Sequence, residues 1–223
     1  MAGFLVLVAA ELAVPAWAEF GGRPTPWHPG HITERYGGFT IIVLGEVIAA
    51  IAAAAQAAVD HSRASPSLVT AATAGLLLVF ALWWLYFKHS AAEDIRQSRP
   101  WTFVWGLSHY LIFAAVAALG AGLQVVIGTL IHSTHVSPAF AACTVAIPVT
   151  IYIVVLALLR TRRSGGLAAL QVTLLTATLI LAAAAAAPAL TLPLSIMVMV
   201  VLVALLLVYN LTAAHRAARH PER

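Results

Sequence analysis

Charged side chains are scarce in this chain: they make up 9% of its 223 residues, whereas 62% of the residues are hydrophobic. Soluble domains carry roughly 25% charged residues. The composition therefore excludes a soluble enzyme, and too few polar residues remain for a separate nucleotide-binding, zinc-ribbon or catalytic domain. We predict an integral membrane protein.

Cysteine is nearly absent as well, because Cys143 is the only one and lies in an apolar stretch. No disulfide framework or thiolate metal site can be built from it. The HExxH, Walker A, GxSxG and dinucleotide-binding signatures are missing too. We therefore expect no enzymatic activity, no cofactor and no bound metal. The net charge of +4 is better explained by membrane topology than by a nucleic-acid partner.

What the chain has instead is a series of apolar segments, each long enough to cross a bilayer. Their continuous Leu, Val and Ala runs exclude barrel strands, which alternate in polarity. We predict an all-α polytopic transmembrane helical bundle of about seven spans. It forms a single domain over residues 1–213, followed by a short basic cytoplasmic tail at 214–223. The predicted spans are 1–18, 36–58, 68–87, 101–131, 137–159, 166–187 and 192–213. Pro148 should be a tolerated kink within the fifth span, and Pro188 and Pro193 indicate a tight turn before the last.

Basic residues predict the orientation of these spans. Eleven Lys and Arg fall on one side, and Arg63 alone falls on the other. This bias places the N-terminus outside and the C-terminus in the cytoplasm of a multi-pass protein of the bacterial inner membrane. All six tryptophans fall near predicted helix ends on the cytoplasmic side, as an aromatic belt would. The eleven basic residues are Arg23, Arg35, Lys88, Arg96, Arg99, Arg160, Arg162, Arg163, Arg216, Arg219 and Arg223.

Three ionisable residues fall inside predicted spans: Glu11, Glu46 and His109. Each costs about 2.5–3.5 kcal/mol at mid-bilayer unless it is paired, neutralised or hydrated. At 1.5 Å per residue, Glu46 lies about 16 Å beyond Arg35, near the middle of the membrane. We expect the three groups at similar depth, where they form either a proton relay or cation site, or hydrogen bonds that hold helices together. Small residues predict close packing of this helix against another one: Gly45, Ala49, Ala53 and Ala57 repeat every four residues, and Ala50, Ala54 and Ala58 continue the stripe that begins at Glu46.

The segment before the second predicted span, residues 26–35 (PWHPGHITER), is the least random stretch of the chain. Thr33 is expected to cap that span, with Glu34 in its first turn. His28 and His31 are spaced as metal ligands can be, as are His132 and His135, but paired histidines in such loops are mostly solvated.

Residues 31–46, HITERYGGFTIIVLGE, resemble the H-x-x-E-R-x-x-x-F-x-I-I-x-L-G-E signature of the bacterial low temperature requirement A family. The resemblance singles out His31, Glu34, Arg35 and Gly45 together with Glu46. It extends to Glu11 through Pro15, to residues 83–87 (WWLYF), and to His109. Family members are polytopic membrane proteins named for growth in the cold. They are typically longer, which implies that this chain corresponds to a C-terminal portion, and they commonly carry an acid where Lys88 stands here.

Intramembrane acids and histidine favour a transporter or proton/ion-coupled permease with a polar site around Glu46. The alternative is a non-transporting membrane component that adjusts lipid or envelope properties for growth in the cold. Besides the lipid bilayer, we expect a further copy of the chain or the absent N-terminal half as partner. Anionic phospholipids are expected at one group of basic residues, because each basic charge near acidic lipid is worth about 1 kcal/mol. This group is Arg160, Arg162, Arg163, Arg216 and Arg219.

The charge bias yields a direct test of orientation. A reporter that works only in the cytoplasm should be active after Arg223 and in the 160–166 loop, and inactive at 132–136, since positively charged loops stay inside. Reporter activity at 132–136 would contradict either the orientation or the number of spans.

Overall fold

The computed structural model describes residues 2–20, 28–60, 62, 65–88, 95, 99–164 and 167–219, with the side chains of some residues near helix ends left undescribed. The described residues form helices and no strands. In chain order the helices are α1 (Ala2–Phe20), α2 (Pro29–Asp60), α3 (Pro66–Phe87), α5 (Arg99–Leu130), α6 (Pro138–Ser164), α7 (Leu167–Ala185), α8 (Ala187–Leu190) and α9 (Leu192–Arg219). The prediction of an all-α bundle is confirmed.

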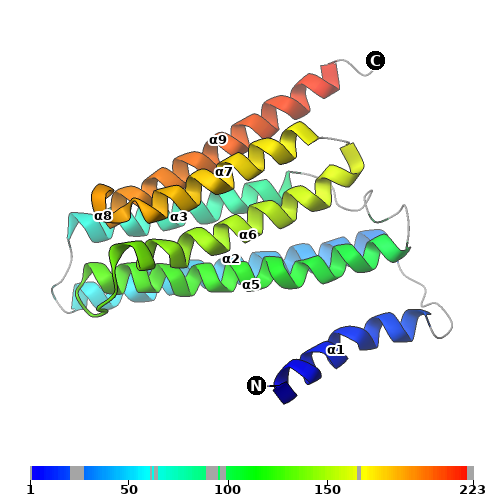
Figure 1. Cartoon of the computed structure of the whole chain (residues 1–223), viewed down its shortest axis with the longest axis horizontal. Coiled ribbons are helices and arrows are strands. Elements are labelled where there is room, and N and C mark those ends of the chain that lie inside the picture. Colours follow the sequence, from blue (N-terminus) through cyan, green and yellow to red (C-terminus); the bar gives the residue numbers. More distant parts are fainter. Residues whose placement is uncertain are drawn as a thin grey trace.

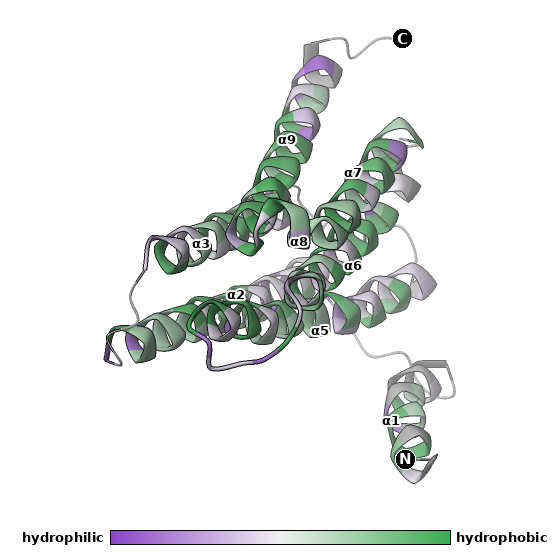
Figure 2. Cartoon of the chain, turned by 60° about the vertical axis from the view of Figure 1, so that its left-hand side comes forward, coloured by the Kyte–Doolittle hydropathy of each residue, from purple (hydrophilic) through white to green (hydrophobic). Residues whose placement is uncertain are grey.

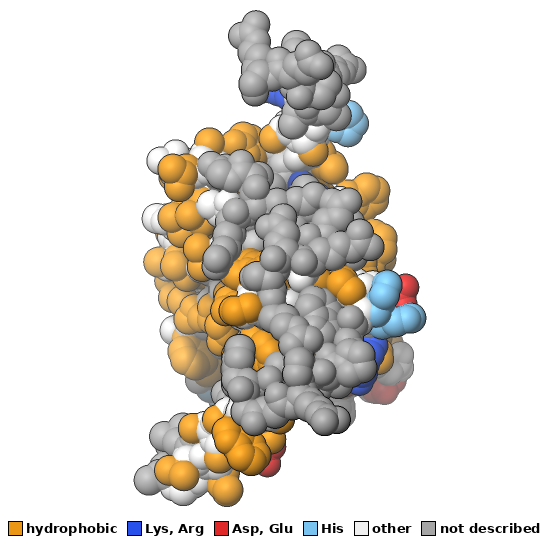
Figure 3. All heavy atoms as spheres, turned by 90° about the vertical axis from the view of Figure 1, so that its right-hand side faces the viewer, with side chains coloured by type: hydrophobic (Ala, Val, Ile, Leu, Met, Phe, Trp, Pro, Cys, Tyr) orange, Lys and Arg blue, Asp and Glu red, His pale blue; other side chains and the backbone are white. Residues whose placement is uncertain are grey.

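Six of these helices, α2, α3, α5, α6, α7 and α9, are long and apolar enough to cross a membrane. Large hydrophobic side chains point outward from them, as Phe80 does with 60% of its surface exposed and Ile42 with 67%. Hydrophobic residues run along the helices, and hydrophilic ones gather toward the helix ends (Figure 2). Orange side chains cover much of the described surface in Figure 3. Such an exterior is stable in lipid and not in water, so the protein is a multi-pass membrane protein.

The six helices alternate in direction, so their connections fall at two ends of the bundle (Figure 1). The start of α2, the end of α3, the start of α5, the end of α6 and the end of α9 share one end. Described basic residues lie there: Arg35, Lys88, Arg160 and Arg216. The fold therefore gathers at one end these four of the eleven basic residues that the orientation prediction assigns to the cytoplasm.

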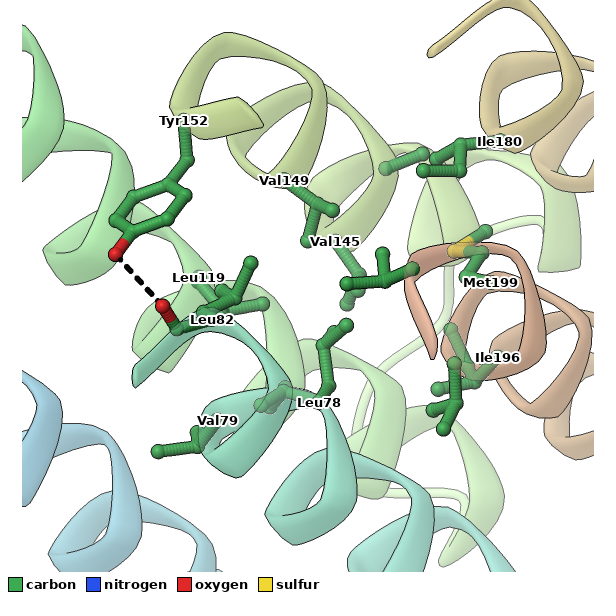
Figure 4. Packing of buried hydrophobic residues seen from close by; sticks show 14 of the residues in the cluster. Leu78, Val79, Leu82, Leu119, Val145, Val149, Tyr152, Ile180, Ile196 and Met199 are labelled. Carbon is green, nitrogen blue, oxygen red and sulfur yellow. Dashed lines mark hydrogen bonds between the residues drawn. The ribbon is translucent and has the colours of Figure 1, made fainter. Parts of the chain in front are cut away.

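The core of the bundle lies where α3, α5, α6, α7 and α9 meet (Figure 4). Leu78, Val149 and Ile196 are fully buried at this junction. The Tyr152 hydroxyl of α6 donates a hydrogen bond of 3.0 Å to the Leu82 carbonyl of α3, so the largest buried side chain leaves no polar atom without a partner.

Helices α5 and α6 approach each other closely at Gly122 and Thr144. A Cβ atom placed on Gly122 would overlap the Thr144 carbonyl oxygen. That carbonyl lacks its usual helical donor, because the residue four positions later is Pro148, which has no N–H. The Thr144 hydroxyl in turn donates to the Gly122 carbonyl at 3.2 Å. Helix α6 continues through Pro148, as predicted, and its freed carbonyl packs against a neighbouring helix.

Helix α2 begins earlier than predicted, at Pro29, and the expectation of a loop over 26–35 capped by Thr33 is wrong for the described part of that segment. The fixed backbone angle of proline suits the first position of a helix. The Thr33 hydroxyl donates to the carbonyls of Pro29 and Gly30, at 3.2 Å and 2.9 Å, as a residue inside a helix does.

Helix α1 coincides with the first predicted span and lies apart from the other helices (Figure 1). Every side chain of α1 that the structure describes is exposed, including Glu11. At the other end of the chain, α9 extends to Arg219 and so includes the first half of the predicted tail.

We predict that Gly122→Ala destabilises the protein, because its methyl group meets backbone that cannot rotate away. Overpacking of this kind costs about 1–3 kcal/mol. Gly38→Ala is the matched control, since a Cβ at Gly38 meets no atom within 4 Å and alanine favours a helix. Thermal unfolding in detergent measures both variants, and equal midpoints would contradict the proposed close approach.

Candidate functional site between helices α2, α3 and α5

His109 of α5 is the centre of a buried polar group, with 1% of its surface exposed. Its Nδ1 lies 2.7 Å from the Trp105 carbonyl oxygen, and its Nε2 lies 2.9 Å from the Tyr86 hydroxyl of α3. A carbonyl oxygen only accepts hydrogen bonds, so Nδ1 carries the proton. In the neutral ring, Nε2 therefore accepts the hydrogen bond that Tyr86 donates.

Aromatic rings surround this histidine. The Trp105 ring centroid lies 4.0 Å from that of His109, Tyr36 of α2 lies at 4.8 Å, Phe113 at 5.7 Å and Tyr86 at 5.8 Å. These four rings form a box that covers the imidazole. Trp105 is 4% exposed. It is therefore part of the box and not of an interfacial aromatic belt, which corrects the prediction for this tryptophan.

A cavity of about 450 Å³ lies beside the box, between α2 and α5. It shares Tyr36 and Phe113 with the box, so the two are separated by a single layer of rings. Its lining consists of Ile32, Arg35, Tyr36, Phe39, Gly106, Tyr110 and Phe113. An opening of this size is typical of small-molecule sites.

Two cations lie at the end of α3, next to Tyr86. The Arg160 guanidinium of α6 donates hydrogen bonds to the carbonyls of Leu85 and Tyr86, where a positive charge stabilises the negative end of the helix. The Lys88 Nζ is buried and has no hydrogen-bond partner in the part of the chain that the structure describes. Burial, and to a smaller extent Arg160, lowers the pKa of Lys88 to about 8.

The three predicted intramembrane groups are not brought together. Glu46 is exposed on the outer side of α2 and does not line the cavity, while Glu11 is exposed on α1. The stripe of Gly45, Ala49, Ala53 and Ala57 is exposed too, and a Cβ at Gly45 would meet no atom within 4 Å. The helix-packing prediction is therefore wrong for these four residues, because α2 turns a different face, with Leu44, Val47 and Ile51, to the bundle. In the row that begins at Glu46, Ala50 and Ala54 are half-buried and Ala58 is buried.

The remaining candidates lie at the surface or outside the described side chains. His31 and Glu34 are exposed, with Nδ1 and Oε2 separated by 3.7 Å. Arg35 lines the cavity, and Arg216 is exposed near the end of α9. The side chains of Arg162, Arg163 and Arg219 lie outside the described ones. The described residues hold no cluster of three His, Cys, Asp or Glu that could bind a metal.

Sequence reasoning identified His109 but missed Tyr36 and Tyr86, which surround it. Both lie within stretches quoted for the family resemblance, 31–46 and 83–87, yet a tyrosine carries no formal charge to mark it as costly in lipid. The signal that was available is the four-residue spacing of Trp105, His109 and Phe113, which places three rings on one face of α5.

Comparison with known proteins agrees with the resemblance in residues 31–46. The model of one family, described as bacterial low temperature requirement A protein (LtrA), matches residues 1–208. The chain therefore belongs to this family. No curated protein matches the chain, and no solved structure matches it.

Lys88 gives a prediction for pH dependence. Its folded pKa, about 8, lies below the ordinary 10.5, so between these values the unfolded chain binds more protons than the folded one, and stability should rise with pH. Below about pH 8 the lysine is charged in both states and contributes no slope. Thermal unfolding in detergent from pH 7 to 10.5 measures the rise, which Lys88→Met should abolish and Arg216→Gln should leave in place. A slope unchanged in Lys88→Met would contradict the assignment.

Proposed function

We propose that this member of the low temperature requirement A family is a proton-coupled transporter of the bacterial inner membrane. In this proposal it has seven spans, α1 being the first, with its N-terminus outside and its C-terminus in the cytoplasm. The observation that carries the proposal is the buried imidazole of His109, hydrogen-bonded to Tyr86 one ring layer from the α2–α5 cavity.

Histidine is suited to this role because its ordinary pKa lies near neutrality, so a modest change of surroundings decides its charge. A proton that reaches His109 would bind at Nε2, since Nδ1 already carries one. The Tyr86 hydroxyl would then turn from donor to acceptor, which a hydroxyl can do by rotation. Protonation of His109 thus reverses one hydrogen bond that joins α5 to α3.

The cavity supports the same proposal through its position. It lies toward the end of the bundle where Arg35, Lys88 and Arg160 gather, which the charge bias assigns to the cytoplasm. Tyr36 contributes to both the cavity lining and the ring box. A solute in the cavity would therefore contact the ring that covers His109, and the charge of His109 would affect how that solute binds.

The alternative function, a non-transporting component that adjusts lipid or envelope properties in the cold, is favoured by one observation. Transport through Glu46 requires a cavity that reaches it, and Glu46 is not among the residues that line the α2–α5 cavity. We therefore centre the transport proposal on His109. Glu46 is retained as a second proton or cation site on the outer side of α2, and Glu11 as a third on α1.

The proposal predicts that proton flux depends on His109. The purified protein is placed in vesicles that contain a pH-sensitive dye. When a proton gradient is imposed, protons should enter through the protein and acidify the lumen. His109→Gln should fold but lose most of this flux, because an amide keeps hydrogen-bonding atoms and cannot carry a proton at neutral pH. Tyr86→Phe should reduce the flux less, since it leaves the imidazole in place.

The controls separate chemistry from folding. Protein yield and unfolding temperature are measured for each variant, and Tyr209→Phe is the control because it changes a tyrosine of α9 that does not line the α2–α5 cavity. Glu46→Gln and Glu46→Leu test the second site in the same vesicles. A His109→Gln protein with full flux would refute the proposal. A wild-type protein without flux under any gradient would favour the alternative.

A further inference from the structure

The α2–α5 cavity has a lining that goes beyond what proton transfer requires. On α2, its residues are spaced three or four apart, at Ile32, Arg35, Tyr36 and Phe39. Residues so spaced share one face of a helix. On α5 the same pattern appears at Gly106, Tyr110 and Phe113. Two helix faces therefore enclose the cavity, and Gly106 opens it, because a Cβ there would lie 3.0 Å from the Tyr36 hydroxyl.

The two ends of the cavity differ in chemistry. Arg35 supplies the one formal charge of the lining, and its neighbour Glu34 is not among the lining residues. About one helical turn deeper, roughly 6 Å, the lining is aromatic. The Phe39 and Phe113 centroids lie 5.3 Å apart, and Tyr36 stacks on Phe113 at 6.2 Å with an interplanar angle of 18°.

The aromatic end is open at the side of the bundle. Phe39 is 57% exposed and Tyr110 is 60% exposed, although both line the cavity. These rings lie on the lateral surface of two helices that are long and apolar enough to cross a membrane. A lipid chain can therefore reach them from the bilayer, while the long Arg35 side chain extends its charge toward the headgroup region.

We propose that this cavity binds one anionic amphiphile, with its acidic headgroup on Arg35 and its hydrocarbon along Phe39, Tyr110 and Phe113. Arginine matches the planar oxygen pairs of phosphate and carboxylate, and the Tyr36 and Tyr110 hydroxyls can donate further hydrogen bonds. A soluble anion would leave the rings unused, and a neutral lipid would leave the guanidinium unused. The volume of about 450 Å³ falls within the range of roughly 300–1,000 Å³ for small-molecule sites.

This site differs from the predicted lipid contacts at Arg160, Arg162, Arg163, Arg216 and Arg219. Those residues lie near the ends of α6 and α9 and were expected to attract acidic lipid as a charged patch. The cavity instead combines one charge with an apolar groove, so it selects both a headgroup and a chain. The inference does not depend on transport, since a bound lipid could equally be structural or a cargo.

Native mass spectrometry of the full chain in neutral detergent tests the site. The probes are phosphatidylglycerol, phosphatidylcholine with the same acyl chains, palmitate and glycerol phosphate. We expect saturable binding of phosphatidylglycerol or palmitate at one site, and much weaker binding of phosphatidylcholine and glycerol phosphate. Tighter binding of phosphatidylglycerol would identify the ligand as a phospholipid, and tighter binding of palmitate would identify it as a free fatty acid.

Matched variants locate the bound molecule. Arg35→Gln should weaken binding of the anionic probe about tenfold, which corresponds to roughly 1.4 kcal/mol. Arg63→Gln, which changes the basic residue that the charge bias assigns to the other side of the membrane, should have no effect. Phe39→Ala should also weaken it, whereas Phe80→Ala, at a ring of α3 with nearly the same exposure of 60%, should not. Gly106→Leu fills the cavity and keeps Arg35, so it should abolish binding even if Arg35→Gln folds poorly.

Three results would overturn the inference: equal binding of phosphatidylcholine and phosphatidylglycerol, binding of glycerol phosphate as tight as that of the amphiphiles, or undiminished binding in Gly106→Leu. Proton flux in vesicles is a separate measurement, so loss of lipid binding with retained flux distinguishes this site from the proposed function.

Discussion

The close contact between Gly122 of α5 and the Thr144 backbone of α6 is the constraint on which the rest of the bundle depends. In lipid each polar backbone group must find its partner within the protein. Pro148 removes the donor that the Thr144 carbonyl would otherwise have, and only a glycine lets a second helix approach that oxygen. This close approach fixes how α5 lies against α6, and α5 also carries His109 and part of the cavity lining.

The same rule explains where the other polar side chains lie. Tyr152 donates to a carbonyl of α3, Arg160 donates to two more, and His109 donates to its own helix. These groups hold neighbouring helices in register, although they are too few to form an aqueous pathway by themselves. His109 differs from the other two, because its second nitrogen can still gain a proton. The one side chain in this set with a nitrogen that can still bind a proton is thus the one enclosed by rings.

Much of the fold could be predicted from residues 66–219, where apolar runs and Pro or Gly boundaries mark the helices. The start of α2 could not, since Thr33 and Glu34 suit a cap as well as a first turn, and Pro29 decided between them. The site was harder. Counting charges in lipid finds His109, but which rings cover it depends on how α2, α3 and α5 pack. Tyr36 and Tyr86 come from two different helices, 50 residues apart in sequence numbering, and no local period connects them.

Glu46 illustrates that the sequence predicts the depth of a residue in the membrane more easily than the side of the helix on which it lies. The spacing along α2 predicts its depth, but its side of the helix follows from Leu44, Val47 and Ile51, which face the bundle. Glu46 is therefore exposed beside Gly45, with open space around that glycine. A carboxyl at this depth costs about 2.5–3.5 kcal/mol unless it is covered, hydrated or neutralised. Glu46 lies seven residues, about two turns, beyond Phe39 and therefore on the same face of α2 as Arg35 and Phe39, although it does not line the cavity. The described part of this chain does not cover the Glu46 carboxyl. Its cost in lipid must therefore be offset by protonation, by water or by another molecule that packs against this face of α2.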